Sequence, residues 1–91
     1  MIPEEVKKQF EEAVEKNNHK VWAGVNQTMR KVYEKSAKIV LIAEDTQPKE
    51  LVMPLAQEVK TKKIPHYFGT KDEIAKLTKC PRPAAAGCLL N

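Results

Sequence analysis

A continuous apolar run at residues 39–42, which reads Ile-Val-Leu-Ile, constrains the fold more than any other feature. A strand with one face in water alternates apolar and polar residues, whereas this run contains no polar residue. Such a run is typical of a central strand that is covered on both faces. The sequence therefore predicts a buried strand at residues 38–43, with helices packed on each side of its sheet.

Helical and extended patterns alternate along the rest of the chain. The predicted strands are residues 20–23, 38–43, 64–68 and 84–90. Gly24 interrupts the chain after the first strand, and Gly69 is expected to form a turn after the third. The predicted helices are residues 3–17, a segment with an apolar stripe at Val25, Met29, Val32 and Tyr33, a segment that Pro48 opens, and residues 70–78. This alternation predicts the α/β class.

Local signals refine three of these helices. Asn17 and Asn18 are expected to end the first helix, whose apolar stripe is Val6, Phe10, Ala13 and Val14. Pro54 lies inside the third helix and is expected to kink or restrict it, because proline has no N–H to donate. The apolar side of that helix is Leu51, Val52, Leu55, Ala56 and Val59. Thr70 and Glu73 have the spacing of a capping box at the start of the fourth helix.

The composition fits one small globular domain, residues 1–91. The chain has 91 residues, is 42% hydrophobic and 31% charged, and carries a net charge of +4. This size allows one modest core, and the basic balance fits a polyanionic partner. The sequence contains no apolar run of membrane-spanning length and no signal-peptide pattern, so we expect a cytoplasmic protein that does not engage membranes.

Catalytic and metal-binding patterns are missing from the sequence. His19 and His66 are the only histidines, and neither has a second ligand at metal spacing. The adjacent acids Glu44 and Asp45 lack an accompanying base or nucleophile, so a turn or helix-capping role is favoured. Cys80 and Cys88 match no CxxC pattern, which favours two buried free thiols over a disulfide or a metal site. We expect no enzyme, no metal, no cofactor and no small-molecule substrate.

The most distinctive polar segment begins at Gly24. Asn26 lies four residues and Gln27 three residues before Arg30, so on a helix the three side chains share one face. Carboxamides donate and accept hydrogen bonds, and a guanidinium can fork onto guanine, so this face suits the reading of base edges. The N-terminus of the helix favours a nearby phosphate. The alternative is an ordinary solvated face of an amphipathic helix.

Four motifs together resemble the L7Ae family of kink-turn-binding ribosomal proteins. They are Gly24-x-Asn26-Gln27-x-x-Arg30, then Ile42-Ala43-Glu44-Asp45-x-x-Pro48, then Ile64-Pro65, then Arg82-Pro83. The family has a GxNExxK segment, an IAED-x-x-P strand end, an IP before the third strand and a loop that often reads VSRP. The order and the spacing agree over nearly the whole chain.

The resemblance implies a three-layer α-β-α sandwich around a four-stranded mixed sheet. It also implies binding to kink-turn or kink-loop RNA, in which the GxNExxK helix reads tandem sheared G·A pairs and the loop before the last strand caps the bulged nucleotides. Family members serve in the large ribosomal subunit, in box C/D and H/ACA guide ribonucleoproteins and in archaeal ribonuclease P. The partners implied are kink-turn-containing rRNA or guide RNA, with ribosomal or guide-ribonucleoprotein proteins, in an archaeal-type, ribosome-associated setting.

The sequence departs from the family pattern at four positions. Gln27 replaces the acidic residue and loses a charge-assisted bond, whereas Arg30 replaces lysine and should keep a guanine contact. Pro81 stiffens the loop and removes one donor. The chain ends at Asn91, without the C-terminal helix of longer relatives, so the first helix or a partner would have to cover more of the sheet. A variant of the GxNExxK motif also occurs in relatives of the ribosomal L30e protein. The strand-end and Arg82-Pro83 motifs, however, favour the L7Ae subfamily.

The residues assigned to the RNA site follow from these motifs. The site consists of Gly24, Asn26, Gln27, Arg30, Lys31, Lys20, Glu44, Lys79, Cys80, Pro81, Arg82, Pro83 and Ala84. We expect Lys20, Lys31, Lys35 and Lys79 to contact phosphates. The prolines stiffen the loop, so that Arg82 and Ala84 can meet unstacked bases; alternatively, they only end a helix and enter an edge strand.

A second class of function stays open. It is a protein-interaction module on the same fold that does not bind RNA, of the stress-inducible growth-arrest type. Such relatives tend to be acidic and lack the amide-rich helix start, whereas this chain has a pI of about 9.1 and carries Asn26 and Gln27.

Overall fold

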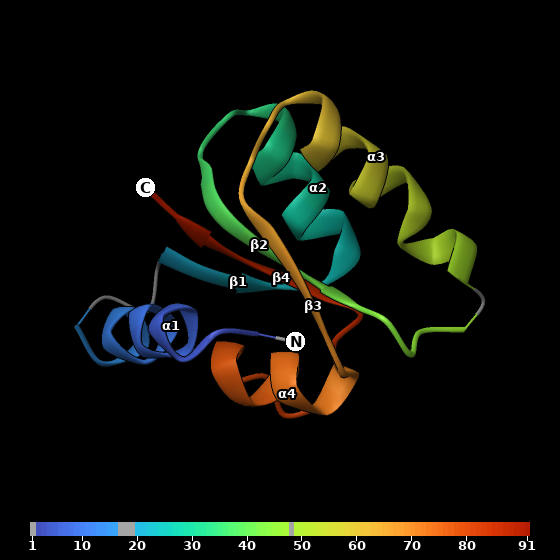
Figure 1. The fold of residues 1–91 in the computed structure, drawn as a ribbon. Coiled ribbons are helices and arrows are strands. Elements are labelled where there is room, and N and C mark those ends of the chain that lie inside the picture. The colour runs from blue at the N-terminus through green and yellow to red at the C-terminus, as the bar shows by residue number, and fades with distance from the viewer. Residues whose placement is uncertain (1, 17–19, 48) are drawn as a thin grey trace.

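The computed structural model describes residues 2–16, 20–47 and 49–91, which form four strands and four α-helices with one short 3₁₀ turn (Figure 1). The elements in order are α1 (Glu4–Lys16), β1 (Val21–Ala23), α2 (Val25–Tyr33), β2 (Ala37–Ala43), η2 (Lys49–Leu51), α3 (Met53–Thr61), β3 (His66–Gly69), α4 (Lys71–Thr78) and β4 (Ala86–Leu90). The expectations at residues 17–19 and Pro48, including His19, lie outside the described residues.

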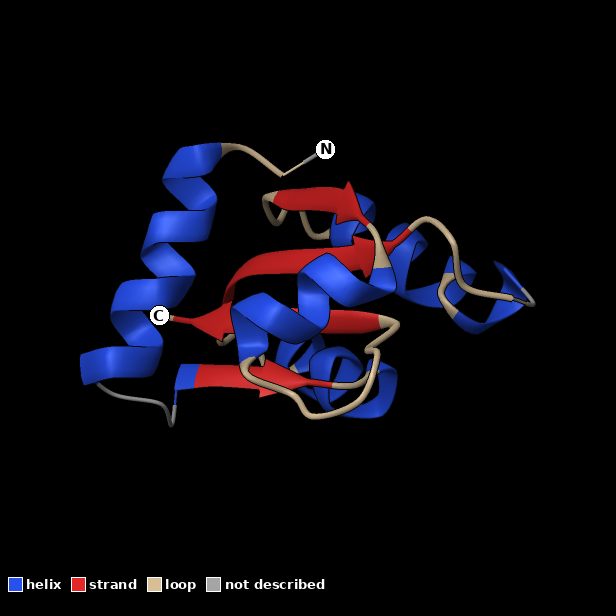
Figure 2. Ribbon diagram, turned by 90° about the horizontal axis from the view of Figure 1, so that it is seen from below, coloured by secondary structure: helices blue, strands red, loops and turns tan. Residues whose placement is uncertain are grey.

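The four strands form one mixed sheet in the order β1-β4-β2-β3. Strands β2 and β3 run parallel, whereas β4 runs antiparallel to both β1 and β2. The last strand of the sequence is therefore an interior strand, flanked on both sides, and not an edge strand. This arrangement confirms the expected four-stranded mixed sheet, and it brings the start of β4 beside the ends of β1 and β2 (Figure 2).

Helices cover both faces of the sheet. Helices α1 and α4 lie on one face, and α2 and α3 lie on the other (Figures 1 and 2). Strand β2 supplies both layers: Leu41 packs with Phe10 and Ile74 on the first face, and Ile42 packs with Leu55 on the second. Burying a side chain of this size contributes about 1.5–3 kcal/mol, so the continuous apolar run explains why both helix layers form.

The third helix differs from its prediction. Helix α3 begins at Met53, after the 3₁₀ turn η2, so Pro54 lies in its first turn and not in its interior. The first N–H groups of a helix have no partner within it, so a proline there costs no hydrogen bond, and the predicted kink was wrong. Leu51 ends η2 and is 53% exposed, so it does not belong to the apolar side of the helix.

Three further boundaries or environments were predicted wrongly. Tyr33 is 58% exposed because the buried line of α2 runs instead through Thr28 and Val32, which are four residues apart. Gly69 is the last residue of β3 and not a turn, since the amide of Glu44 donates to its carbonyl at 2.8 Å. Cys80 is only half-buried, whereas Cys88 is buried; both thiols are free.

The helices begin and end with two different kinds of local structure. The predicted capping box is present, with the Glu73 amide donating to Thr70 Oγ1 and the Thr70 amide donating to Glu73 Oε1, each at 3.1 Å. The hydrogen bond from the Thr70 amide lowers the pKa of Glu73. By contrast, a lysine with positive φ follows or ends α2, α3 and α4, namely Lys35 (61°), Lys63 (57°) and Lys79 (56°). Glycine is the usual residue in this left-handed position.

Among the described residues, no helix has the length and apolar character needed to cross a bilayer. The same residues include no group of three or more His, Cys, Asp or Glu side chains that could hold a metal ion.

Candidate nucleic-acid interface

Gly24 sets the start of α2. Its φ of 106° and ψ of 145° lie in a region that residues with a Cβ rarely adopt, while a Cβ built there would meet nothing within 4 Å. The glycine is thus required by the backbone, and the space above it is open. Helix α2 has no side-chain cap and no acid in its first turn, so its N-terminal N–H groups keep their partial positive charge for an external anion.

The polar face of α2 points to solvent as predicted. Asn26, Gln27 and Arg30 are exposed, while Thr28 and Val32 on the opposite face are fully buried. Within the part of the chain that the structure describes, the three exposed side chains form no hydrogen bond or ion pair with protein groups. Their donors and acceptors are therefore free to meet a ligand.

The loop between α4 and β4 lies beside this helix start. The Gly24 amide donates to the Ala86 carbonyl at 2.8 Å, which joins the β1–α2 junction to the end of the loop. Pro81, Arg82 and Pro83 are exposed. The two segments are far apart in the sequence, and the pairing of β1 with β4 is what brings them together.

The ends of the loop are fixed to the fold. The Cys80 amide donates to the Ala75 carbonyl at 2.9 Å, and Cys80 packs against the core. Exposed Lys79 ends α4 in the left-handed conformation. Ala84 is only 5% exposed, since its methyl group lies in the core with α1 and α4. The exposed part of the loop is therefore limited to its two prolines and Arg82.

The end of β2 contributes an acidic turn at the same edge of the sheet. The Ala43 amide donates to the Ala85 carbonyl at 2.8 Å, so Glu44 follows directly beside the loop, with its side chain exposed. Asp45 accepts a hydrogen bond from the Lys71 amide at 2.9 Å through its Oδ1. This bond confirms the helix-capping role expected from the sequence, because Lys71 is the first residue of α4.

Of the lysines assigned to phosphate contacts, one on α2 is largely covered and two lie away from the start of that helix. Lys31 is mostly covered: its Nζ lies 4.8 Å from the centre of the Trp22 ring and 3.7 Å from the Glu34 carboxylate. Lys20 precedes β1, at the end of that strand remote from Gly24. Lys35 follows the C-terminus of α2, a helix of 9 residues that is about 13 Å long at 1.5 Å per residue. The structure brings only Lys79 close to the loop.

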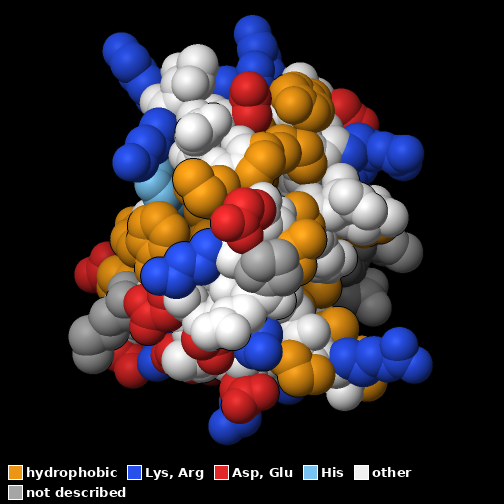
Figure 3. Space-filling view, turned by 90° about the vertical axis from the view of Figure 1, so that its right-hand side faces the viewer, with side chains coloured by type: hydrophobic (Ala, Val, Ile, Leu, Met, Phe, Trp, Pro, Cys, Tyr) orange, Lys and Arg blue, Asp and Glu red, His pale blue; other side chains and the backbone are white. Residues whose placement is uncertain are grey.

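Two exposed apolar side chains at the same end were not anticipated. Met53 and Leu51 are 51% and 53% exposed at the start of α3. Helices α2 and α3 run parallel, because each returns from one parallel strand to the next, so both helices begin at this end. Figure 3 shows hydrophobic side chains reaching the surface on this side of the molecule. Had Pro54 been assigned to the first turn of the helix, the sequence would have predicted that Leu51 and Met53 lie at this end.

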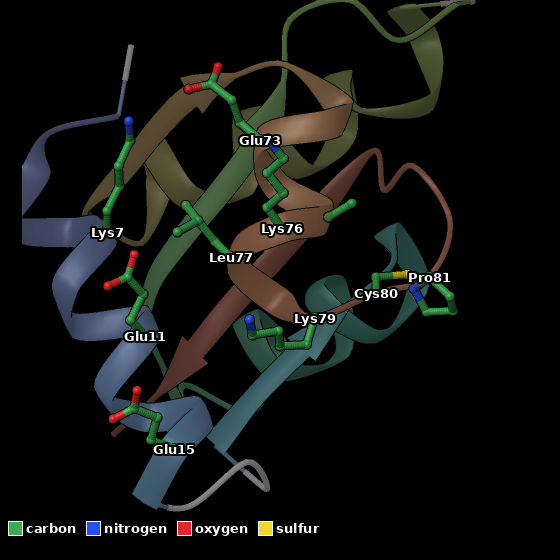
Figure 4. A pocket seen from close by; sticks show the side chains of 10 residues that line it. Lys7, Glu11, Glu15, Glu73, Lys76, Leu77, Lys79, Cys80 and Pro81 are labelled. Atoms are coloured by element: carbon green, nitrogen blue, oxygen red, sulfur yellow. The ribbon is translucent and has the colours of Figure 1, made fainter.

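An open groove of about 820 Å³ lies between α1 and α4 (Figure 4). Its walls carry acids from α1, such as Glu11 and Glu15, opposite bases such as Lys76 and Lys79. The mixed charges oppose one another, so the groove does not have the uniformly basic lining of a phosphate site. It touches the loop only through residues 79–81.

Cys88 is buried beneath α2, and its thiol is expected to be unreactive. Burial raises the pKa of its thiol to about 11, against the smaller lowering effects of neighbours such as Thr28. A thiol of this pKa is protonated near neutral pH and makes a poor nucleophile or metal ligand.

Comparison with known proteins identifies a family and a similar fold. The sequence from residue 4 to residue 90 matches the ribosomal protein L7Ae/L30e/S12e/Gadd45 family. Among solved structures, the fold is similar to that of a Giardia lamblia 15.5kD RNA binding protein, with a TM-score of 0.74 and 24% sequence identity. The matched region covers 80% of this chain and 62% of the Giardia chain, so the chain spans less than two thirds of that relative. Because the family match extends over nearly the whole sequence, the chain belongs to the ribosomal protein L7Ae/L30e/S12e/Gadd45 family.

Proposed function

We propose that the protein binds kink-turn or kink-loop RNA as a structural component of a ribonucleoprotein, without catalysis. The observation that carries this proposal is the hydrogen bond of 2.8 Å between the Gly24 amide and the Ala86 carbonyl. It holds an amide-rich helix start and a proline-stiffened loop side by side, and both present unpartnered polar groups to solvent. Membership of a family that includes ribosomal proteins, and a similar fold in an RNA binding protein, support RNA as the ligand.

The helix start would read base edges. Asn26 and Gln27 can each donate and accept in one plane, which suits the exposed edges of sheared G·A pairs. Arg30 lies one turn further along the same face and can reach guanine or a phosphate with its forked donors. The uncapped N–H groups around Gly24 would hold a phosphate, because the open space there lets the RNA backbone approach closely.

The loop would form the second wall of the site. Pro81 and Pro83 fix their own φ angles, so the loop loses little conformational freedom on binding. Arg82 can stack on an unstacked base, Lys79 can neutralise a phosphate, and the exposed Glu44 carboxylate can accept from an exocyclic amino group. Ala84 and Cys80 would support this wall from the core side, since both pack against it.

The resemblance to the L7Ae family supports a cellular setting for this proposal. Family members serve in the large ribosomal subunit, in box C/D and H/ACA guide ribonucleoproteins and in ribonuclease P, so the kink-turn would belong to an RNA of one of these particles. Ribosomal or guide-ribonucleoprotein proteins would then be its neighbours in a cytoplasmic particle.

A paired titration tests the proposal. The protein is titrated against a kink-turn RNA and against the same RNA with its tandem G·A pairs replaced by Watson–Crick pairs, and binding is followed by gel shift. We expect clearly tighter binding to the kink-turn, and roughly a 5- to 150-fold loss of affinity for each of Asn26→Ala, Gln27→Ala and Arg30→Ala, since a specific base contact contributes about 1–3 kcal/mol.

Lys8→Ala is the matched control, because it removes an exposed cation from α1, on the other face of the sheet. Equal affinity for the two RNAs would end the proposal and favour the protein-interaction module instead. An unaffected triple variant of the helix face would show that the RNA lies elsewhere.

A further inference from the structure

The far end of the molecule carries a second surface with the residue types of a nucleic-acid site. Helices α2 and α3 are parallel and end side by side there, opposite the proposed kink-turn interface (Figure 1). The helix-end surface, as we call it, consists of Tyr33, Lys35, Lys60, Lys62 and Lys63. Figure 3 shows Lys and Arg side chains projecting from this upper end of the molecule.

The centre of the helix-end surface is an exposed aromatic ring. Tyr33 is the last residue of α2 and is 58% exposed. Lys62 Nζ lies 5.8 Å from the centre of this ring and 3.8 Å from the Glu58 carboxylate. The ring is thus held between the two helix ends, with much of its area open to solvent.

Three further lysines at this end of the molecule are not used by the fold. Lys35, Lys60 and Lys63 are exposed and form no ion pair with any of the described residues. The nearby acids are already engaged, because Glu34 pairs with Lys31 and Glu58 pairs with Lys62. The helix-end surface therefore has a clear excess of positive charge.

Helix stability alone does not account for these lysines. Cations near a helix C-terminus are favourable, which explains a lysine such as Lys60. Lys35 and Lys63, however, occupy left-handed positions with φ of 61° and 57°, where glycine is preferred. A lysine there keeps a conformational cost that glycine would avoid.

We propose that the helix-end surface binds a single-stranded segment of RNA, with a base stacked on Tyr33 and its phosphates neutralised by Lys35, Lys60 and Lys63. An exposed aromatic ring at the same end of the molecule as unpaired cations suits a single strand, because the bases of a single strand offer free stacking faces and those of a duplex do not. The surface lies beyond the C-terminus of α2, whereas the proposed kink-turn interface lies at the start of that helix, so it would engage RNA outside the kink-turn.

Three variants separate the contributions of stacking and charge. Tyr33→Ala removes the ring, and Tyr33→Phe keeps it. A triple variant, Lys35→Gln, Lys60→Gln and Lys63→Gln, lowers the net charge from +4 to +1. Its matched control carries Lys8→Gln, Lys16→Gln and Lys76→Gln, which removes the same charge from exposed positions on α1 and α4. Each variant is first shown by thermal unfolding to be folded.

Binding of a fluorescent ten-nucleotide oligouridine is then measured by anisotropy over a range of salt concentrations. We expect Tyr33→Ala to bind roughly 5-fold or more weakly and Tyr33→Phe to bind like the parent. The triple variant should lower the slope of log affinity against log salt by about 2, at about 0.7 per lost phosphate contact, and its control by much less. Equal losses in the triple variant and its control, or equal losses in the two tyrosine variants, would overturn the proposal.

A minimal kink-turn RNA without single-stranded tails provides the second arm. Its affinity should be unchanged in all of these variants, because its site lies at the other end of α2. If kink-turn discrimination fails while the oligouridine results hold, the proposed function is wrong and the helix-end surface stands. If kink-turn discrimination holds while the oligouridine results fail, only the proposal for the helix-end surface is wrong.

Discussion

Replacing Gly24 with alanine isolates the backbone strain at the start of α2. The φ of 106° and ψ of 145° would force an L-residue into a region with a cost of about 1–3 kcal/mol. Alanine also stiffens the unfolded chain, which returns about 0.4–1 kcal/mol. A new Cβ meets no atom within 4 Å, so no steric clash adds to the balance. The net expectation is a loss of about 1–2 kcal/mol in the free energy of unfolding.

Thermal and urea unfolding followed by far-UV circular dichroism measure this loss. For a domain of this size, 1 kcal/mol shifts Tm by about 4–8 °C, so Gly24→Ala should lower Tm by about 4–16 °C. Asn26→Ala is the matched control, because Asn26 is exposed and helical, and its change should stay within about 0.5 kcal/mol. A Gly24→Ala protein as stable as this control would refute the strain argument.

The same substitution bears on RNA. The alanine methyl group would project into open space where the proposed interface lets a phosphate approach. We therefore expect the folded fraction of Gly24→Ala to bind a kink-turn more weakly than the parent, whereas affinity equal to that of the parent would place the RNA backbone away from Gly24.

Three other predictions concern stability and reactivity. Lys63→Gly should raise the free energy of unfolding by about 0.5–1 kcal/mol in urea melts, because glycine relieves the left-handed backbone; a loss would contradict this. Thr70→Ala should cost about 0.5–2 kcal/mol at neutral pH. The pKa of Glu73 is lowered mainly by the Thr70 backbone amide, which an alanine at position 70 keeps. The stabilisation from the Glu73 carboxylate is complete above the ordinary pKa of a glutamate and disappears as the pH falls through the lowered value. Melts from pH 7 to pH 3 should therefore show a smaller difference between parent and Glu73→Gln at the acid end, and a constant difference would refute the link. At pH 8 a disulfide reagent should label half-buried Cys80 and leave Cys88, whose pKa is about 11, unmodified until the protein is denatured.

Local chemistry made much of the fold predictable. The capping box at Thr70 and the doubly covered strand at residues 39–42 depend on neighbouring residues and on hydrophobic pattern, so the sequence displays both directly. The start of α3 was missed because a proline inside an apolar pattern was interpreted as a kink. The short 3₁₀ turn before Met53, which shifts the proline into the first helical turn, carries no comparable signal.

The site was predictable only in part. The exposed face of Asn26, Gln27 and Arg30 follows from helical spacing, and the structure confirms its exposure. The positions of Lys20 and Lys35 at the far end depend on strand direction and helix length, which no local pattern records. Likewise, only the pairing of β1 with β4 brings the loop to Gly24, and that pairing joins segments far apart in the chain.

The interior position of β4 sets the order in which the protein can become functional during synthesis. Strand β1 pairs only with β4 among the described strands, and β4 is the last of the four to leave a ribosome. Until then β1 has no partner, the Gly24–Ala86 hydrogen bond cannot form, and the loop has no fixed place beside α2. Bringing β1 and β4 together closes a long loop of chain, which has an entropic cost. The pairing of β4 with both β1 and β2 offsets this cost. A nascent chain would therefore acquire the edge that carries the proposed RNA site only together with its completed sheet.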